Sequence, residues 1–146
     1  YNARLAKGKA NYDIRADNLL ATIERFAADI GSSSALIDRH LNEEAGSFFD
    51  AEADDIFYFT KGKLYGYYMV LQGLGTDFEP IIKERNLQKP WNEMMESFRK
   101  AALLDPWVVM NGDPDAQFQP NHLATQGFYL LRARTQLREI SKILLK

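Results

Sequence analysis

The chain has 146 residues, of which 46% are hydrophobic and 26% are charged, and its formal net charge is −2. This length and composition suit one globular domain (1–146) with its own core, and they exclude an intrinsically disordered chain. The small net charge argues against a dedicated nucleic-acid binder, which is normally strongly basic. The absence of cysteine excludes disulfides, zinc ribbons and thiol catalysis. No apolar run approaches the length of about 20 residues that a membrane-spanning helix needs.

Apolar residues recur at steps of three and four along the first third of the chain, which predicts amphipathic helices. The first pattern covers about residues 11–30. Gly31 follows it and can supply the left-handed residue that ends a helix. Ser32–Ser34 then offer N-caps for a second helix, which should end near Gly46. We therefore expect two helices in this region.

A third helix should begin around Asp50, because its first turns are rich in carboxylates that favour the positive end of the helix dipole. Gly62 and Gly66 lie four residues apart inside it, and each costs roughly 1 kcal/mol relative to alanine. We expect this pair of glycines to let another helix approach closely. Gly73 and Gly75 should then close the helix.

The second half of the chain predicts three further helices. Asp77 should cap a short one, and Pro90 suits the first position of the next. The last helix opens at Pro120 and carries a leucine at every seventh residue. Only residues 107–110 have any strand character. We therefore predict an all-α fold, a helical bundle of four long helices plus one or two short helices.

The connection 105–119 has no helical period, and connections of this length are usually functional or disordered. Its segment Trp107–Met110 is too apolar to be left in solvent. Oxygen-bearing side chains follow at alternate positions, as in an EF-hand loop, but the glycine and the bidentate glutamate of that loop are missing. We keep a small-molecule or divalent-metal site beside the simpler interpretation of a polar turn. The candidate ligand-binding residues are Asn111, Asp113, Asp115, His122 and Gln126.

Complete catalytic motifs do not occur in the sequence. It lacks the paired Glu-x-x-His motifs of di-metal bundles, a phosphate-binding glycine loop and a nucleophile elbow. A histidine-based mechanism would have to use His40 or His122. We therefore predict no catalytic residue and no cofactor, and a hydrolase built on the 105–119 connection is the least favoured interpretation.

Charge is distributed unevenly along the chain. The stretch 43–55 carries six acidic residues and no basic one, whereas the last helix is mainly basic. Arg134 lies about 40° from the leucine stripe on that helix. An arginine so near a core needs a carboxylate partner. We predict a structural ion pair of Arg134 with Asp17, Asp54 or Asp55.

Phe128 and Ile143 make the last helix apolar on more than one face. Such a helix is either central in its bundle or meets another chain with part of its surface. Because no complete catalytic set is present, the leading hypothesis is a non-enzymatic interaction or scaffold domain. It would contact a protein partner or a second copy of itself, and no nucleic acid.

Several segments of the chain resemble a known family. Pro120–Ala124 and Gly127–Ile140 resemble a signature of an uncharacterised bacterial family, domain of unknown function 2333. Arg15–Leu19 and Ala53–Tyr58 are similar to its other blocks. Members of that family look like proteobacterial proteins with one N-terminal membrane helix ahead of a soluble helical domain, and a first residue of Tyr1 rather than Met fits such a fragment. The resemblance implies an inner-membrane-anchored protein of the cell envelope with a periplasmic domain, and it brings no activity.

Overall fold

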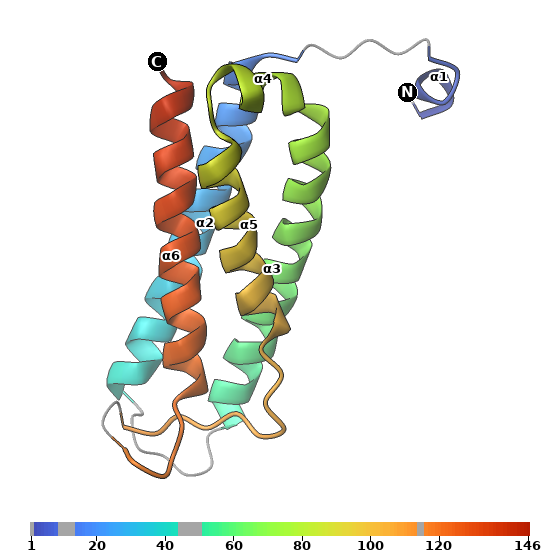
Figure 1. The fold of residues 1–146 in the computed structure, drawn as a ribbon. Helices are drawn as coiled ribbons and strands as arrows, with labels where there is room; N and C mark the ends of the chain where they lie inside the picture. The colour runs from blue at the N-terminus through green and yellow to red at the C-terminus, as the bar shows by residue number, and fades with distance from the viewer. Residues whose placement is uncertain (1, 9–13, 44–50, 114–115) are drawn as a thin grey trace.

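The computed structural model describes residues 2–8, 14–43, 51–113 and 116–146, and every regular element in these ranges is a helix. The helices are α1 (Asn2–Leu5), α2 (Ala16–Glu43), α3 (Ala51–Asp77), α4 (Glu79–Glu84), α5 (Gln88–Leu103) and α6 (His122–Leu144). Figure 1 shows α2, α3, α5 and α6 side by side, with the short α4 at the end where α2 begins. The prediction of an all-α bundle of four long helices is confirmed.

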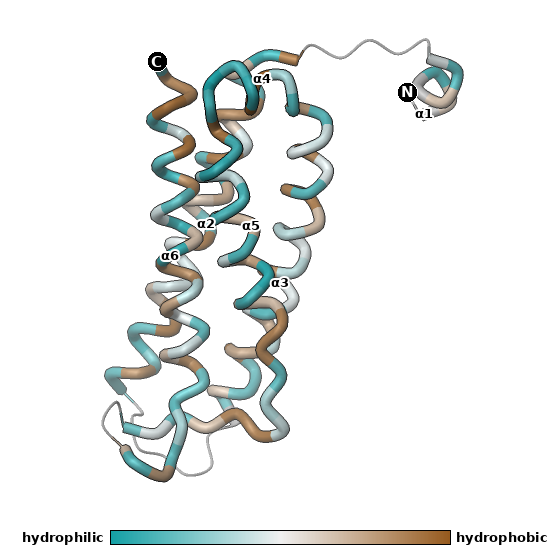
Figure 2. The backbone as a smooth tube through the Cα atoms, in the orientation of Figure 1, coloured by the Kyte–Doolittle hydropathy of each residue, from teal (hydrophilic) through white to brown (hydrophobic). Residues whose placement is uncertain are grey.

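The helix α6 has the most extensive packing in the bundle. It packs along α2 and α5, and α5 in turn packs along α3, whereas α2 and α3 contact each other much less. Its leucine stripe is the reason, because Leu123, Leu130 and Leu137 are fully buried and Leu144 is nearly so. Figure 2 shows hydrophobic and hydrophilic residues alternating along all four helices, as amphipathic helices require.

The helix α2 is one continuous helix of 28 residues, so the prediction of two helices was wrong. Gly31 does not end it but makes room for a side chain of α6. A Cβ atom at Gly31 would lie 2.9 Å from Cζ of Arg134. Ser32 and Ser33 place their hydroxyl groups against carbonyl groups four residues earlier, as interior helical serines do, rather than capping a new helix. The expected boundaries near residues 11 and 46 lie outside the described residues.

The helix α3 also continues past the residues expected to end it. Gly75 lies inside the helix, and a Cβ atom there would come within 2.8 Å of the Trp91 indole nitrogen. The glycine thus lets Trp91 of α5 pack directly against the α3 backbone. The expected start near Asp50 lies outside the described residues.

Gly62 and Gly66 do not mark a close helix contact, so this prediction was also wrong. A Cβ atom at either glycine would meet no other atom within 4 Å. They lie on an exposed face of α3 that also carries Tyr65, Met69 and Val70, each about half exposed. The buried face of the same helix, which includes Phe57, Leu64 and Leu71, points into the bundle.

The remaining helix ends fall close to the predicted positions. Asn86 takes a left-handed conformation (φ 54°) between α4 and α5. Pro90 is the third residue of α5 rather than the first. The helix α6 begins two residues after Pro120, because Asn121 is its N-cap and accepts a hydrogen bond from the Ala124 backbone nitrogen at 2.7 Å.

Candidate functional site

The connection between α5 and α6 crosses one end of the bundle, where α2 ends and α3 begins (Figure 1). Its two arms are joined at Asn111 and Asn121, which form an isolated antiparallel bridge. The side-chain nitrogen of Asn121 donates to the carbonyl oxygen of Gly112 at 2.6 Å and to Oδ1 of Asn111 at 3.2 Å. The backbone nitrogen of Gly112 donates to the Pro120 carbonyl oxygen at 3.3 Å. Residues 107–110, where strand character was expected, form no strand. The described part of the connection has only this single bridge at Asn111, the next residue.

His122, the first residue of α6, fastens the same junction. Its backbone nitrogen donates to the Met110 carbonyl oxygen at 2.9 Å, and its Nδ1 accepts from the Met110 backbone nitrogen at 3.0 Å. Partial burial lowers the pKa of His122 below its ordinary value. The Nδ1 atom must be unprotonated to accept this bond, so the imidazole holds the connection in place rather than facing a ligand with that nitrogen.

We call this group of Asn111, Gly112, Asn121 and His122 the junction. A Cβ atom at Gly112 would overlap the carbonyl oxygen of Gln119, so only glycine fits there. Asn111 is fully buried within the junction. The junction therefore fixes where both arms of the connection leave the bundle.

The five candidate ligand-binding residues are not all brought together. Asn111 and His122 meet in the junction, whereas Asp113 is exposed and Asp115 lies outside the described residues. Gln126 is fully buried, and its amide nitrogen donates to the Phe57 carbonyl oxygen at 3.0 Å. No group of three His, Asp or Glu side chains able to hold a metal ion occurs among the residues that the structure describes.

The apolar start of the connection is less buried than the sequence predicted. Only Val109 is buried in the segment 107–110, and Trp107 is fully exposed. Phe118 on the second arm is also fully exposed, and Leu103 and Val108 are more than half exposed. Figure 2 shows hydrophobic residues in this connection at the end of the bundle. We call the four exposed residues Leu103, Trp107, Val108 and Phe118 the loop-end patch.

A polar cluster joins α2 to α3 halfway along the bundle. The Tyr67 hydroxyl donates to Oδ2 of Asp29 at 2.5 Å, and Nζ of Lys63 lies 3.1 Å from the same oxygen. The hydrogen bond from Tyr67 and then Lys63 hold the pKa of Asp29 below its ordinary value. Burial and the bond to Asp29 raise the pKa of Tyr67 to about 12. Lys63 also donates to the Ser33 hydroxyl at 3.1 Å, so the cluster is a structural link between the helices.

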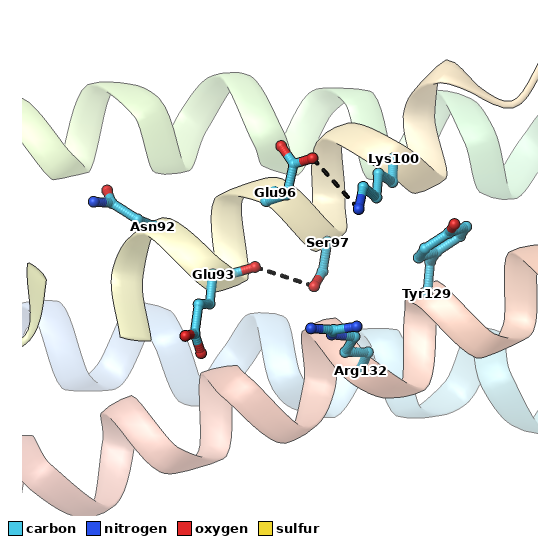
Figure 3. Close-up of a pocket in the computed structure, with 7 residues that line it drawn as sticks. All are labelled: Asn92, Glu93, Glu96, Ser97, Lys100, Tyr129 and Arg132. Carbon is cyan, nitrogen blue, oxygen red and sulfur yellow. Dashed lines mark hydrogen bonds and ion pairs between the residues drawn. The ribbon is translucent and has the colours of Figure 1, made fainter. Parts of the chain in front are cut away.

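A groove of about 240 Å³ runs between α5 and α6 (Figure 3). Glu96 stands at its edge, where the hydrogen bond from Arg99 lowers the pKa of Glu96 to about 2. The Ser97 hydroxyl lies 2.7 Å from Oε1 of Gln136 and therefore serves the packing of α5 on α6. The groove is lined by Asn92, Glu93, Glu96, Ser97, Lys100, Tyr129 and Arg132. It contains charges of both signs but no histidine beside the serine, so the lining supplies no nucleophile with its base.

The structure places Arg134 away from its three candidate partners. The antiparallel packing of α2 and α6 sets Arg134 beside Gly31, more than three turns along α2 from Asp17. Asp17 instead accepts a hydrogen bond from Arg15 at 2.6 Å. Asp54 and Asp55 lie near the start of α3, level with the first turn of α6. The Nε atom of Arg134 is buried without a hydrogen-bond partner in the described part of the chain.

Phe128 and Ile143 on α6 are the side chains for which the sequence suggested contact with another chain. Phe128 is 58% exposed, and Leu131, one turn further along, is 54% exposed. Ile143 is partly buried and packs against the core. The outer face of α6 thus exposes an apolar pair at Phe128 and Leu131.

No helix in the described ranges is both long enough and apolar enough to cross a membrane. No curated protein and no solved structure matches the chain. One bacterial family does match, with the description "Uncharacterized protein conserved in bacteria", over residues 38–146. The matched range includes the quoted segments of α3 and α6, whereas Arg15–Leu19 lies ahead of it. The chain therefore belongs to DUF2333, a family of uncharacterised bacterial proteins.

Proposed function

We propose that this domain acts through contacts with other protein chains and carries out no chemistry of its own. The observation that carries the proposal is the large apolar side chains that the bundle leaves exposed. They occur on α3 (Phe59, Tyr65, Met69, Val70), on α6 (Phe128, Leu131) and in the loop-end patch. Single exposed apolar residues are ordinary, but groups of them on one surface are typical of interaction sites.

The alternative of a small-molecule or metal site in the 105–119 connection has less support. His122 uses Nδ1 and its backbone nitrogen to hold Met110, and Gln126 turns its amide nitrogen towards Phe57. These polar groups are engaged within the chain rather than directed at a common point, and the Gln126 amide oxygen, which has no hydrogen-bond partner among the described residues, is fully buried. A hydrolase built on the same residues would lack a general base beside an activated nucleophile.

We further propose that the domain belongs to an inner-membrane-anchored envelope protein and lies in the periplasm. The resemblance to proteins with an N-terminal membrane helix supports this arrangement. The helix α2 begins at the end of the bundle opposite the loop-end patch (Figure 1). A tether ahead of α2 would place the patch at the far end of the bundle from the bilayer, roughly 40 Å beyond the start of α2, the length of a 28-residue helix.

Two experiments test these proposals on the full-length protein in bacterial cells. A photo-crosslinking amino acid replaces Tyr65, Phe118 or Phe128 in turn, and Glu139 on α6 serves as the control position. We expect a discrete adduct from at least one apolar position and none from the control. Absence of adducts from all three positions would contradict a function based on protein contacts. An alkaline phosphatase fused after Lys146 should be active if the domain is periplasmic, and an inactive but stable fusion would contradict that location.

A further inference from the structure

We propose that the loop-end patch binds a basic segment of a partner protein that also carries apolar side chains. This inference rests on the proposed function and specifies both the surface and the chemistry of its partner. It follows from three features of the same end of the bundle: a connection tied at several points, exposed aromatic rings and exposed carboxylates.

The connection that carries the patch is held at several points. The junction ties its two arms together, and both arms leave from it. The first arm is also tied to α3, because the Tyr58 hydroxyl donates to the Pro106 carbonyl oxygen at 3.0 Å and Lys61 pairs with Asp105 at 2.6 Å. Trp107 therefore follows directly on two residues that are fastened to the bundle. A fixed connection loses little conformational entropy when a partner binds.

The two aromatic residues of the patch do not pack in the core. Trp107 and Phe118 are fully exposed, although Trp91 and Phe98 in the same bundle are buried. Tryptophan and phenylalanine are enriched at protein interfaces, and tryptophan is among the residues that contribute most to binding. Trp107 directly follows residues tied to α3, and Phe118 lies two residues before Pro120, whose carbonyl oxygen accepts from Gly112. The two exposed rings present the apolar part of a contact surface.

Carboxylates lie at the same end of the bundle as this apolar part. The helix α2 ends here with Glu43, α3 begins here with Glu52, Asp54 and Asp55, and Asp113 lies in the connection. All five side chains are exposed. None of them takes part in the ion pairs found among the residues that the structure describes. Among the described bases near this end, Lys61 pairs with Asp105, Arg99 and Lys100 both pair with Glu96, and Arg39 is exposed, so the carboxylates outnumber the bases.

The negative charge at this end of the bundle favours one kind of binding partner. A basic segment is attracted to it, and complementary charge accelerates association and fixes orientation. An anionic membrane surface is repelled by the same carboxylates. A second copy of the chain that presented its own loop-end patch would bring two acidic surfaces together. A partner with lysine or arginine beside leucine-like side chains satisfies both the apolar and the charged part of the surface.

The test uses the fluorescence of Trp107, because Trp107 is exposed whereas Trp91, the second tryptophan, is buried. The variant Trp91→Phe retains only the Trp107 signal, and its circular dichroism verifies the fold. The probe is a synthetic amphipathic helical peptide with lysine on one face and leucine on the other. Matched peptides replace leucine by alanine or lysine by glutamate. Vesicles of phosphatidylcholine and phosphatidylglycerol provide the membrane comparison.

We expect the Lys–Leu peptide to shift the Trp107 emission to shorter wavelength, with much weaker effects from both matched peptides. Phe118→Ser and the double variant Asp54→Asn/Asp55→Asn should each weaken binding about tenfold, whereas Tyr65→Ser on α3 should leave it unchanged. Affinity should fall with added salt in the parent protein and less so in the double aspartate variant.

Four outcomes would overturn the inference. They are equal binding of the Lys–Leu and Lys–Ala peptides, binding insensitive to Phe118→Ser, an emission shift with vesicles but not with the peptide, and self-association in sedimentation experiments that is accompanied by a Trp107 emission shift without peptide. Any of these, combined with cellular crosslinks from Tyr65 or Phe128, would leave the proposed function standing and remove only this surface. Absence of crosslinks from all positions would remove the proposed function itself.

Discussion

His122 has a structural role, although its position at the start of α6 suggests a ligand-binding residue. Its Nδ1 accepts a hydrogen bond from the Met110 backbone, so protonation would turn an acceptor into a donor that faces another donor. Burial lowers the pKa of the folded His122 below the ordinary value of 6.5. The unfolded chain therefore binds a proton at a higher pH than the folded chain does. The stability that unprotonated His122 contributes is fully present above pH 6.5, and it is lost as the pH falls from 6.5 through the lower pKa of the folded state.

The direction of this pH dependence can be tested with the variant His122→Asn, whose amide oxygen can accept the hydrogen bond from Met110 without titrating. The wild-type protein should lose melting temperature relative to the variant as the pH falls from 7.5 to 5, measured by circular dichroism. Above pH 7 the difference between the two proteins should be constant. A difference that does not change over the whole range would show that His122 does not titrate against the junction.

Gly112 provides a second prediction at the scale of one residue. The variant Gly112→Ala should lower the free energy of unfolding by about 1–3 kcal/mol, because its Cβ overlaps the Gln119 carbonyl oxygen. Urea denaturation measures this loss. The matched control Gly62→Ala, where the Cβ enters open space, should instead raise the free energy of unfolding by about 0.5–1 kcal/mol. Equal stabilities of the two alanine variants would contradict the packing described for the junction.

Among the helix pairs, α2 and α3 depend most on polar contacts. They pack on each other much less than on α6 and α5, and the cluster of Asp29, Lys63 and Tyr67 joins them. Tyr67→Phe removes the hydrogen bond to Asp29 and should lower the free energy of unfolding by about 1 kcal/mol, a value kept small because Asp29 is partly exposed. Tyr65→Phe, on the exposed face of the same helix, is the control and should have no effect on unfolding.

The pKa of Tyr67 also reports its hydrogen bond with Asp29. In the wild-type protein NMR titration of labelled tyrosine should show Tyr67 ionising at a pKa of about 12. Asp29→Asn removes a neighbouring negative charge and should lower that pKa, while burial keeps it above 10. An unchanged Tyr67 pKa in the variant would mean that the two side chains do not interact in solution.

The helices could be predicted from the sequence because their apolar periodicity is strong, and the breaks between them were harder to place. Gly31, Gly62 and Gly75 look alike in the sequence, but each has a different role. Gly31 accommodates Arg134, Gly75 accommodates Trp91, and Gly62 faces open space. The difference depends on which side chain of another helix lies opposite, and one sequence does not contain that information.

The residues of the candidate site show the same limit. Asn111 and His122 could be identified from the sequence because polar side chains are spaced through and just beyond the 105–119 connection. Their partners could not, because Asn111 accepts from the Asn121 amide and His122 accepts from the Met110 backbone nitrogen. Trp107 was expected to be buried because it is apolar, yet the core is filled by the helices and the residue is exposed. The position of Arg134 depends on the register of α2 against α6, which periodicity alone does not fix.

At the scale of the whole molecule, the bundle has two unlike ends. One holds the start of α2 and the end of α6, and the other holds the junction, the loop-end patch and the carboxylates at the start of α3 (Figure 1). The four helices bury one core and fix this second end in place. We infer that another protein covers this second end in the cell.

Hydroxyl-radical footprinting of the full-length protein tests that claim most directly. The modification of Trp107 and Phe118 is quantified by mass spectrometry in intact cells and in the purified protein, with Tyr65 as an internal reference on α3. We predict that Trp107 and Phe118 are strongly modified after purification and protected in cells, relative to Tyr65. Equal modification of Trp107 and Phe118 in cells and in the purified protein would contradict the account.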